Sequence, residues 1–348
     1  MIPNFYYHPR QMEYDFGPGH PLKPIRLQRT MELLQALVPN IEFKDPGFGD
    51  RQDVLRVHGP DYVEAVQNLS EGMCLEAEKK FEFGFGSGDN PPFLGMYEAA
   101  LAYCASGVQA ARDVNNGAQL AFNMAGGLHH ARQSQASGFC IFNDAAISCH
   151  ILRERFDRVM YIDIDLHHGD GVQWIFYEDP SVLTYSIHET GRTLYPGTGF
   201  TRERGVDSTS INVPLEAGTT GDVWLTAFRD TVIPAFEHFS PGAIVLQMGC
   251  DAHIDDPLGH LRVSVQKWLA AVAFVRDFNV PIVACGGGGY AMANVPRMWV
   301  GAILTLCGLT VPDEIPSSIP AEWGMTTFHD DESRVPSGIG GTYAEDAL

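Results

Sequence analysis

Short apolar runs alternate along the chain with longer segments in which apolar residues recur every three or four positions. The short runs are rich in β-branched residues and predict buried strands at 119–124, 158–165, 182–188, 243–248 and 280–285. The longer segments predict helices at 24–37, 95–114, 171–177 and 262–278. This alternation favours an α/β fold in which helices cover both faces of a mainly parallel sheet. In such sheets, functional side chains gather after the carboxyl ends of the strands.

Two segments break the alternation. Residues 70–92 carry many glycines and polar residues and end in Asp-Asn-Pro-Pro, which predicts a surface loop. Residues 310–348 are rich in Pro, Ser and acidic residues, which predicts a C-terminal tail that wraps the surface or is partly disordered. The 348 residues contain no internal repeat or long linker, and 45% of them are hydrophobic. We therefore expect a single domain over 1–348.

Composition narrows the class of partner. With 43 acidic and 23 basic residues, the formal net charge is -20, which disfavours nucleic acid and suits cationic partners such as lysine-bearing peptides or polyamines. The same charge is equally consistent with a role in solubility alone. The seven cysteines form no Cys-x-x-Cys pair and predict free thiols in a reducing compartment. The chain shows no signal-peptide pattern and no apolar stretch of transmembrane length, so we expect a cytoplasmic protein without a membrane partner.

The strongest chemical signal lies at the end of the strand predicted for 158–165, where Asp-Ile-Asp-Leu-His-His-Gly-Asp-Gly begins at Asp163. Alternate side chains of a strand share one face, so Asp163, Asp165 and His167 point the same way. Burying these polar groups together is costly unless a cation joins them. Asp165 and His167 are thus two candidate ligands of a divalent metal ion.

Asp251, which follows the predicted strand 243–248, supplies a third ligand. Three protein ligands and one open position are typical of a catalytic zinc site, although iron(II) also suits this ligand set. Asp255 and Asp256 are close enough in sequence to be alternatives to Asp251. In the same region, His168 is expected to be a hydrogen-bonded core histidine.

Two adjacent histidines, His129 and His130, follow the predicted strand 119–124 and are candidates for acid–base catalysis. Asp163 and Asp170 are carboxylates available to orient the two imidazoles. Considered alone, Asp170 is better explained as a residue that caps the helix it opens. A histidine pair is often structural, and this one gains weight from the neighbouring metal ligands.

Four consecutive glycines, 286–289, precede Tyr290 and follow the predicted strand 280–285. The glycines let the backbone turn tightly, and the hydroxyl of Tyr290 is placed to stabilise an oxyanion in a cleft. A phosphate-binding loop is excluded because the segment lacks Gly-Lys-Ser/Thr and its spacing.

Taken in order, these motifs resemble those of the histone deacetylase superfamily, and most of all those of the bacterial acetoin-utilization deacetylases. The resemblance runs from about residue 6 to about residue 309. It rests on Gly17-Pro-Gly-His20-Pro-Leu-Lys-Pro24-Ile-Arg26, Gly127-Leu-His129-His130-Ala, Ser137-Gly-Phe139-Cys-Ile-Phe-Asn143-Asp144, the 163–171 run, Tyr195-Pro-Gly-Thr-Gly199, Gly249-Cys-Asp251 and 286–290.

The resemblance implies an arginase/deacetylase-like three-layer fold with a central sheet of about eight strands. It implies zinc on Asp165, His167 and Asp251, His129 paired with Asp163, and His130 paired with Asp170. His130 would be the main general base and acid, His129 its electrostatic partner, and Tyr290 would polarise the acyl carbonyl.

Further positions follow only from the resemblance. Gly138 and Phe139 would line a narrow tunnel for the lysine stem, with Tyr195 on the opposite wall, where the family usually has phenylalanine. Asp89 would hold the substrate backbone at the rim, and Arg26 would lie at the inner end of the tunnel. A structural potassium ion would be held by Asp163, Asp165, His167, Ser186 and Ile187.

The function expected from this reasoning is zinc-dependent hydrolysis of an acetyl or other acyl group on lysine. An acetylpolyamine amidohydrolase shares the chemistry and is the nearest alternative. A non-catalytic module that binds acyl-lysine has no need of both histidines and Tyr290. An arginase-like ureohydrolase requires two clustered manganese ions and additional Asp and His ligands, which the sequence does not reveal.

Overall fold

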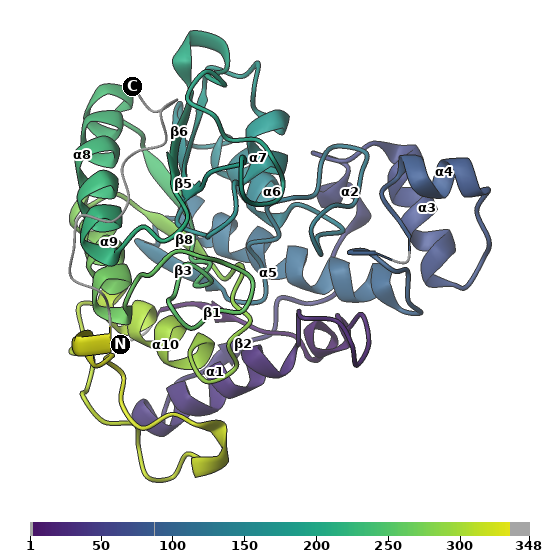
Figure 1. Ribbon diagram of the computed structural model, residues 1–348. Helices are drawn as coiled ribbons and strands as arrows, with labels where there is room; N and C mark the ends of the chain where they lie inside the picture. Colours follow the sequence, from purple (N-terminus) through teal and green to yellow (C-terminus); the bar gives the residue numbers. More distant parts are fainter. Residues whose placement is uncertain (1–2, 87, 335–348) are drawn as a thin grey trace.

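The computed structural model describes residues 3–86 and 88–334, and its centre is one eight-stranded sheet in which all neighbouring strands run parallel (Figure 1). The strand order is β2-β1-β3-β8-β7-β4-β5-β6. The strands are β1 (Phe5–Tyr6), β2 (Phe43–Lys44), β3 (Leu120–Asn123), β4 (Val159–Asp163), β5 (Val182–Glu189), β6 (Ser210–Leu215), β7 (Ala243–Gln247) and β8 (Ile282–Cys285). The predicted α/β architecture is confirmed.

Helices cover both faces of the sheet (Figure 1). On one face, α1 packs against α10, α10 against α9, and α9 against α8, while α5, α6 and α7 lie on the other. The helices are α1 (Ile25–Leu37), α2 (Arg51–Val54), α3 (Pro60–Ser70), α4 (Ala77–Glu82), α5 (Met96–Asn115), α6 (Asp144–Leu152), α7 (Asp170–Ile175), α8 (Gly221–Phe239), α9 (Val265–Asp277) and α10 (Val295–Leu306). No helix in the described part of the chain is both long and apolar enough to cross a membrane.

The central strands β3, β4, β7 and β8 are mostly apolar because each contributes side chains to two cores. Along β3, Phe122 faces the core under α1 and α10, whereas Ala121 faces the core under α5. Side chains of successive strand residues point to opposite faces, so a central strand covered on both sides has no polar face. The alternating strand and helix signals in the sequence are the direct result.

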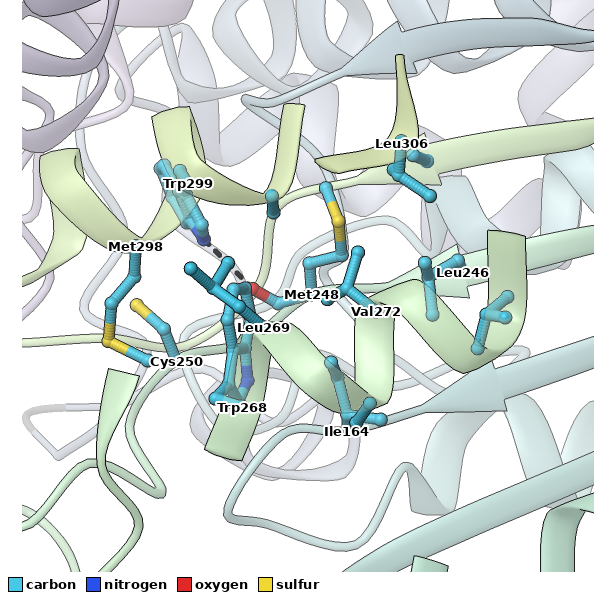
Figure 2. Close-up of a cluster of buried hydrophobic side chains, with 14 of the residues drawn as sticks. Ile164, Leu246, Met248, Cys250, Trp268, Leu269, Val272, Met298, Trp299 and Leu306 are labelled. Carbon is cyan, nitrogen blue, oxygen red and sulfur yellow. Dashed lines mark hydrogen bonds between the residues drawn. The ribbon is translucent and has the colours of Figure 1, made fainter. Parts of the chain in front are cut away.

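Two buried tryptophans fix the backbone just beyond β7 (Figure 2). Trp299 of α10 donates from Nε1 to the carbonyl of Met248 at 2.8 Å, and Trp268 of α9 donates to that of Gly249 at 3.0 Å. Each indole adds a large apolar surface to the core and satisfies a carbonyl that no strand partner reaches. The segment that leads to Asp251 is thereby held on a rigid support.

The prediction that 70–92 is an irregular surface loop was wrong in part. Helix α4 lies within this segment, and Phe83 and Phe85 just after it are buried against Tyr62. Glycine-rich composition masked these local aromatic anchors.

The C-terminal segment wraps the surface as far as residue 334. Its side chains Met325 and Phe328 are buried, and Asp330 forms an ion pair with Arg297 of α10 at 2.6 Å. The remainder of the expected tail, 335–348, lies outside the described residues.

Candidate functional site

Four adjacent strands bring the predicted site residues together. In the sheet, β3, β8, β7 and β4 are consecutive, and each is followed by one of the motifs singled out in the sequence. Because parallel strands end at the same edge, the segments after them converge there. The histidine pair, the glycine run, Asp251 and the Asp165–His167 pair therefore meet although they lie far apart along the chain.

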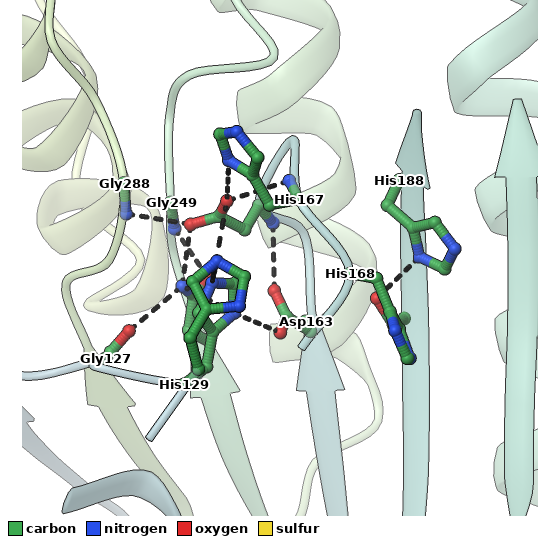
Figure 3. A network of polar contacts seen from close by, with 12 residues as sticks. Gly127, His129, Asp163, His167, His168, His188, Gly249 and Gly288 are labelled. Atoms are coloured by element: carbon green, nitrogen blue, oxygen red, sulfur yellow. Dashed lines mark hydrogen bonds and ion pairs between the residues drawn. The ribbon is translucent and has the colours of Figure 1, made fainter. Parts of the chain in front are cut away.

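Asp165, His167 and Asp251 form a buried cluster whose ligand atoms all lie within 4.8 Å of one another. Nδ1 of His167 is 3.3 Å from Oδ1 of Asp165 and 3.0 Å from Oδ2 of Asp251. Figure 3 shows His167 above the strand ends, on the same side as His129. One imidazole nitrogen and two carboxylate oxygens at one point are a donor set that suits zinc.

The charge of this cluster favours a bound cation. Burial and the negative charge of Asp165 raise the pKa of Asp251. Burial alone would lower the pKa of His167, but hydrogen bonds and charge interactions with the two carboxylates outweigh it and raise the pKa to about 10. Two fully buried carboxylates beside a single histidine leave negative charge that requires compensation, and a divalent cation provides it.

Neither Asp255 nor Asp256 belongs to the cluster. Asp255 pairs with Arg334 at 3.0 Å, whereas Asp256 accepts the backbone N–H groups of Tyr290 at 2.7 Å and Ala291 at 3.2 Å. The spacing in the sequence left Asp251, Asp255 and Asp256 as alternatives for the third ligand, and only Asp251 lies in the cluster. Asp256 instead supports the backbone of Tyr290.

A second group of possible ligands, His129, Asp163 and Asp165, shares Asp165 with the first. Here the side chains already have partners in one another: Nδ1 of His129 lies 2.7 Å from Oδ2 of Asp163. Asp163 also accepts the hydroxyl of Tyr161 at 2.6 Å and the N–H of Asp165 at 3.0 Å. Both oxygens of Asp163 thus accept hydrogen bonds, and we assign Asp163 and His129 to an oriented carboxylate–imidazole pair.

Each of the two adjacent histidines is oriented by its own carboxylate. Nδ1 of His130 lies 2.7 Å from Oδ1 of Asp170, which matches the His129–Asp163 distance. A carboxylate only accepts hydrogen bonds, so the proton of a neutral His130 is held on Nδ1 and its Nε2 keeps a lone pair that acts as an acceptor. Asp170 is the first residue of α7, and its side chain contacts His130 instead of capping that helix.

The pKa values of the two imidazoles move in opposite directions. Burial lowers the pKa of His129, but the charges of Asp163 and Asp165 outweigh this and raise it to about 9. Burial and the positive charge of His129 lower the pKa of His130 to about 4. The Nε2 atoms are 3.1 Å apart, so a charged His129 donates a hydrogen bond to Nε2 of a neutral His130. Of the two, His130 is the one with an unprotonated ring nitrogen near neutral pH, and its Nε2 exchanges the hydrogen bond from His129 for one from water when it acts as a base.

Tyr290 faces the same cluster from the glycine run. Its ring packs edge-on against Phe139, with ring centroids 5.8 Å apart. Burial, followed by the negative charges of Asp251 and Asp165, raises the pKa of its hydroxyl well above the ordinary value. A hydroxyl that stays protonated is a hydrogen-bond donor, which is what a developing oxyanion needs.

The predicted tunnel walls also lie beside the histidines. A Cβ atom on Gly138 would lie 2.3 Å from the ring of His130 and 3.0 Å from that of Tyr195, so only glycine fits between them. The rings of His130 and Tyr195 have centroids 5.1 Å apart, and the hydroxyl of Tyr195 contacts the hydroxyl of Ser137. Gly138, Phe139 and Tyr195 thus surround the approach to His130 and Tyr290.

Comparison with known proteins agrees with this geometry. The family model described as the histone deacetylase domain matches residues 20–306. The chain belongs to the histone deacetylase family. It is 38% identical over 332 residues to the acetoin utilization protein AcuC of Bacillus subtilis (strain 168), covering 92% of this chain and 86% of that protein. It is also 38% identical over 331 residues to histone deacetylase 9 of Arabidopsis thaliana, covering 93% of this chain and 76% of that protein. The identity to histone deacetylase clr6 of Schizosaccharomyces pombe is 34% over 320 residues, covering 90% of this chain and 78% of that protein.

Two positions that came only from resemblance to the histone deacetylase family have distinct surroundings. Arg26 is buried and donates from Nη1 to the carbonyls of Gly287 at 2.7 Å and Gly289 at 3.2 Å. These hydrogen bonds hold the backbone of the glycine run in place. Asp89 is exposed, and its carbonyl lies 3.1 Å from Nε2 of His20. Asp89 borders the same surface groove as Gly138 and Tyr195.

The proposed potassium ligands lie on neighbouring strands. Asp163 of β4 is the register partner of Ser186 of β5, and Ile187 follows it. The hydroxyl of Ser186 lies 2.8 Å from Nδ1 of His188. The potassium site itself stays a prediction. Nearby, His168 is a core histidine as expected, with its ring nitrogens 2.8 Å from the Thr198 hydroxyl and 3.1 Å from Oε1 of Gln173.

Several supporting side chains were missed in the sequence. Gln247, the last residue of β7, donates from Nε2 to Oδ2 of Asp165 at 2.8 Å and accepts the N–H of Gly249 at 2.7 Å. Asp144 accepts the N–H groups of Gly127 at 3.0 Å and Leu128 at 2.9 Å, just before the histidine pair. A polar residue inside an otherwise apolar strand was the available signal for Gln247. No pattern in the sequence near Arg132 indicated its role. Its Nη2 donates to Oδ2 of Asp170 at 3.0 Å.

Proposed function

We propose that this chain is a zinc-dependent amidohydrolase that removes acetyl or other acyl groups from lysine side chains. The observation that carries the proposal is the convergence of two carboxylate-oriented imidazoles and a protonated tyrosine on one buried Asp-His-Asp cluster. A structural zinc site would need neither the imidazoles nor the tyrosine, and membership of the histone deacetylase family supports the same class of hydrolase.

Asp165, His167 and Asp251 would hold the zinc ion. When bound, it would polarise the acyl carbonyl and make a water molecule easier to deprotonate. His130 accepts the proton of the attacking water at Nε2, because Asp170 holds the other ring proton on Nδ1.

The remaining groups act on charge and on the leaving amine. The Tyr290 hydroxyl donates to the carbonyl oxygen as negative charge develops there. His129, kept positive by Asp163, adds to the stabilisation of that charge. His130 then returns its proton to the departing amine, which completes hydrolysis of the amide bond.

The direct test is hydrolysis of a short acetyl-lysine peptide by protein of measured zinc content, with and without a hydroxamate. Hydroxamate-sensitive release of acetate that scales with zinc content would support the proposal. Turnover that scales with iron content would change the metal and keep the mechanism. A zinc-loaded protein that binds the peptide but releases no acetate would point to the non-catalytic module.

An acetylpolyamine amidohydrolase is the second candidate, because the same catalytic groups serve either amide. The net charge of -20 is compatible with a polycationic amine. Relative turnover of acetylspermidine and an acetyl-lysine peptide distinguishes the two substrates.

A further inference from the structure

A surface groove of about 310 Å³ begins at the tunnel residues Gly138 and Tyr195 and extends to Phe81 on α4. One wall is formed by Phe81 of α4 with residues 84–86 and 88–90, and the other by residues 135–138. The walls are joined by a hydrogen bond from the N–H of Ala136 to the carbonyl of Phe83 at 2.9 Å. The groove is therefore preformed, and its volume is at the small end of ligand pockets, which span about 300–1,000 Å³.

Phe81 is a large aromatic residue that is mostly exposed and also lines the groove. The segment Phe81-Glu-Phe-Gly-Phe contains three aromatic rings, of which Phe83 and Phe85 are buried and Phe81 is 83% exposed. No residue of α4 is buried, so Phe81 is not needed to attach this helix to the core. An apolar ring left in water beside a groove is a contact surface for an apolar group.

Asn90 lines the groove but is only 5% exposed. Its Nδ2 donates to the carbonyl of Gly84 at 3.3 Å, and its Oδ1 is buried out of reach of a ligand in the groove. Asn90 therefore supports the groove wall and offers no direct hydrogen bond to a ligand.

The charges of the lining favour a peptide over a polyamine. Among the described residues that line the groove, Asp89 is the only one with a charged side chain. A polyamine carries several ammonium groups and would require several carboxylates. A peptide backbone carries no charge, and an apolar side chain beside the acyl-lysine can pack on Phe81.

We propose that this groove binds the residues beside the acyl-lysine of a peptide substrate, with an apolar side chain packed against Phe81. The proposal rests on the deacylase function proposed above and extends it, because it assigns peptides with a flanking apolar residue as the preferred substrate class.

The test compares acetyl-lysine peptides that carry Phe, Leu, Gly or Asp at each of the two positions on either side of the acetyl-lysine, with acetylspermidine as the polyamine probe. For at least one flanking position, we expect the wild-type kcat/KM to be about tenfold higher with Phe or Leu than with Gly. Phe81→Ala should remove this preference through KM. The matched control is Phe48→Ala, because Phe48 is 81% exposed and does not line the groove.

The outcomes separate the two proposals. Loss of the flanking preference in Phe81→Ala, with the preference kept in Phe48→Ala, supports the groove. Equal turnover of peptides with apolar and Gly flanks, or an unchanged preference in Phe81→Ala, overturns the groove and leaves the deacylase intact. Faster turnover of acetylspermidine than of every peptide overturns the peptide assignment. Lack of turnover of any of these substrates by zinc-loaded protein overturns both proposals.

Discussion

Substitution of Gly288 by alanine tests the metal site without removing any ligand. A Cβ atom at this position would lie 2.1 Å from Oδ2 of Asp251 and 2.8 Å from Oδ2 of Asp165. Real Cβ contacts essentially never fall below 3.0 Å, so the Asp251 carboxylate must move by about 0.9 Å. It cannot do so freely, because its Oδ1 accepts the N–H of Leu166 at 2.9 Å and Gln247 holds Asp165 from the other side.

The expected loss of zinc and of activity follows from how little a zinc ion tolerates displacement of its ligands. Ligand distances in zinc sites are held within about 0.2 Å, several times less than the required movement. A misplacement of about 1 Å at a catalytic group costs roughly 100-fold in rate. We expect Gly288→Ala to lose most of its zinc and at least 100-fold in kcat/KM while keeping its secondary structure. Elemental analysis, peptide deacetylation and circular dichroism measure the three quantities.

The matched control is Gly19→Ala, since no atom lies within 4 Å of a Cβ built there and the backbone does not require glycine. This variant should keep wild-type zinc content. Full zinc occupancy and wild-type turnover in Gly288→Ala would refute the placement of the metal between Asp165, His167 and Asp251.

Three further predictions concern catalysis, pH and the C-terminal segment. Tyr290→Phe should retain zinc and lose about 100- to 1,000-fold in kcat, because it removes only the oxyanion donor; an unchanged kcat would remove Tyr290 from the mechanism. Burial lowers the pKa of His58 to about 4 from 6.5, and its Nε2 accepts the N–H of Asn143 at 2.9 Å. Between pH 4 and 6.5 the unfolded chain therefore binds more protons than the folded chain. The free energy of unfolding has its full value above pH 6.5 and falls by about 3 kcal/mol as the pH drops to about 4. Urea unfolding across this range should show a shallower pH dependence for His58→Gln, and identical curves would contradict the assignment. Asp330→Ala leaves Arg297 buried without its partner and should lower the free energy of unfolding by about 3–5 kcal/mol, whereas the exposed Asp331→Ala should leave the unfolding midpoint unchanged. Equal unfolding midpoints for the two variants would contradict a stabilising role of the Asp330–Arg297 ion pair.

Much of the fold could be predicted from the sequence, because the patterns that indicate strands and helices are local. A strand buried on both faces needs consecutive apolar residues, and those at 159–163 and 243–247 stand out for this reason. Strands β1 and β2 were not predicted, since two residues are too few to show a period and they pair with distant segments. Strand β6 was also missed, because Ser210, Asn212 and Pro214 interrupt its apolar residues. Helix α4 was missed because glycines surround it and none of its residues is buried.

The candidate site likewise contains some residues that a local pattern could predict and others that only the tertiary structure brings together. Asp165 and His167 lie two residues apart just after β4, which ends at Asp163 and not at residue 165 as predicted. Extending the strand period by a few residues was still enough to predict that they point together. Asp251 could not be separated from its acidic neighbours by spacing alone; the choice depends on how β7 is placed against β4 and on the anchoring of the following backbone by Trp268.

What the sequence by itself determined are the properties set within a few residues: the alternation of strands and helices, the histidine pair, and the acidic run that ends β4. Only the tertiary structure decided which distant groups meet these residues. It brought Gln247 to Asp165, Arg132 to Asp170, and Phe81 to the surface groove that also contains Gly138 and Tyr195. The physical reason is that backbone periodicity repeats along the chain, whereas contacts between separate loops depend on strand order and on the packing of the helices between them.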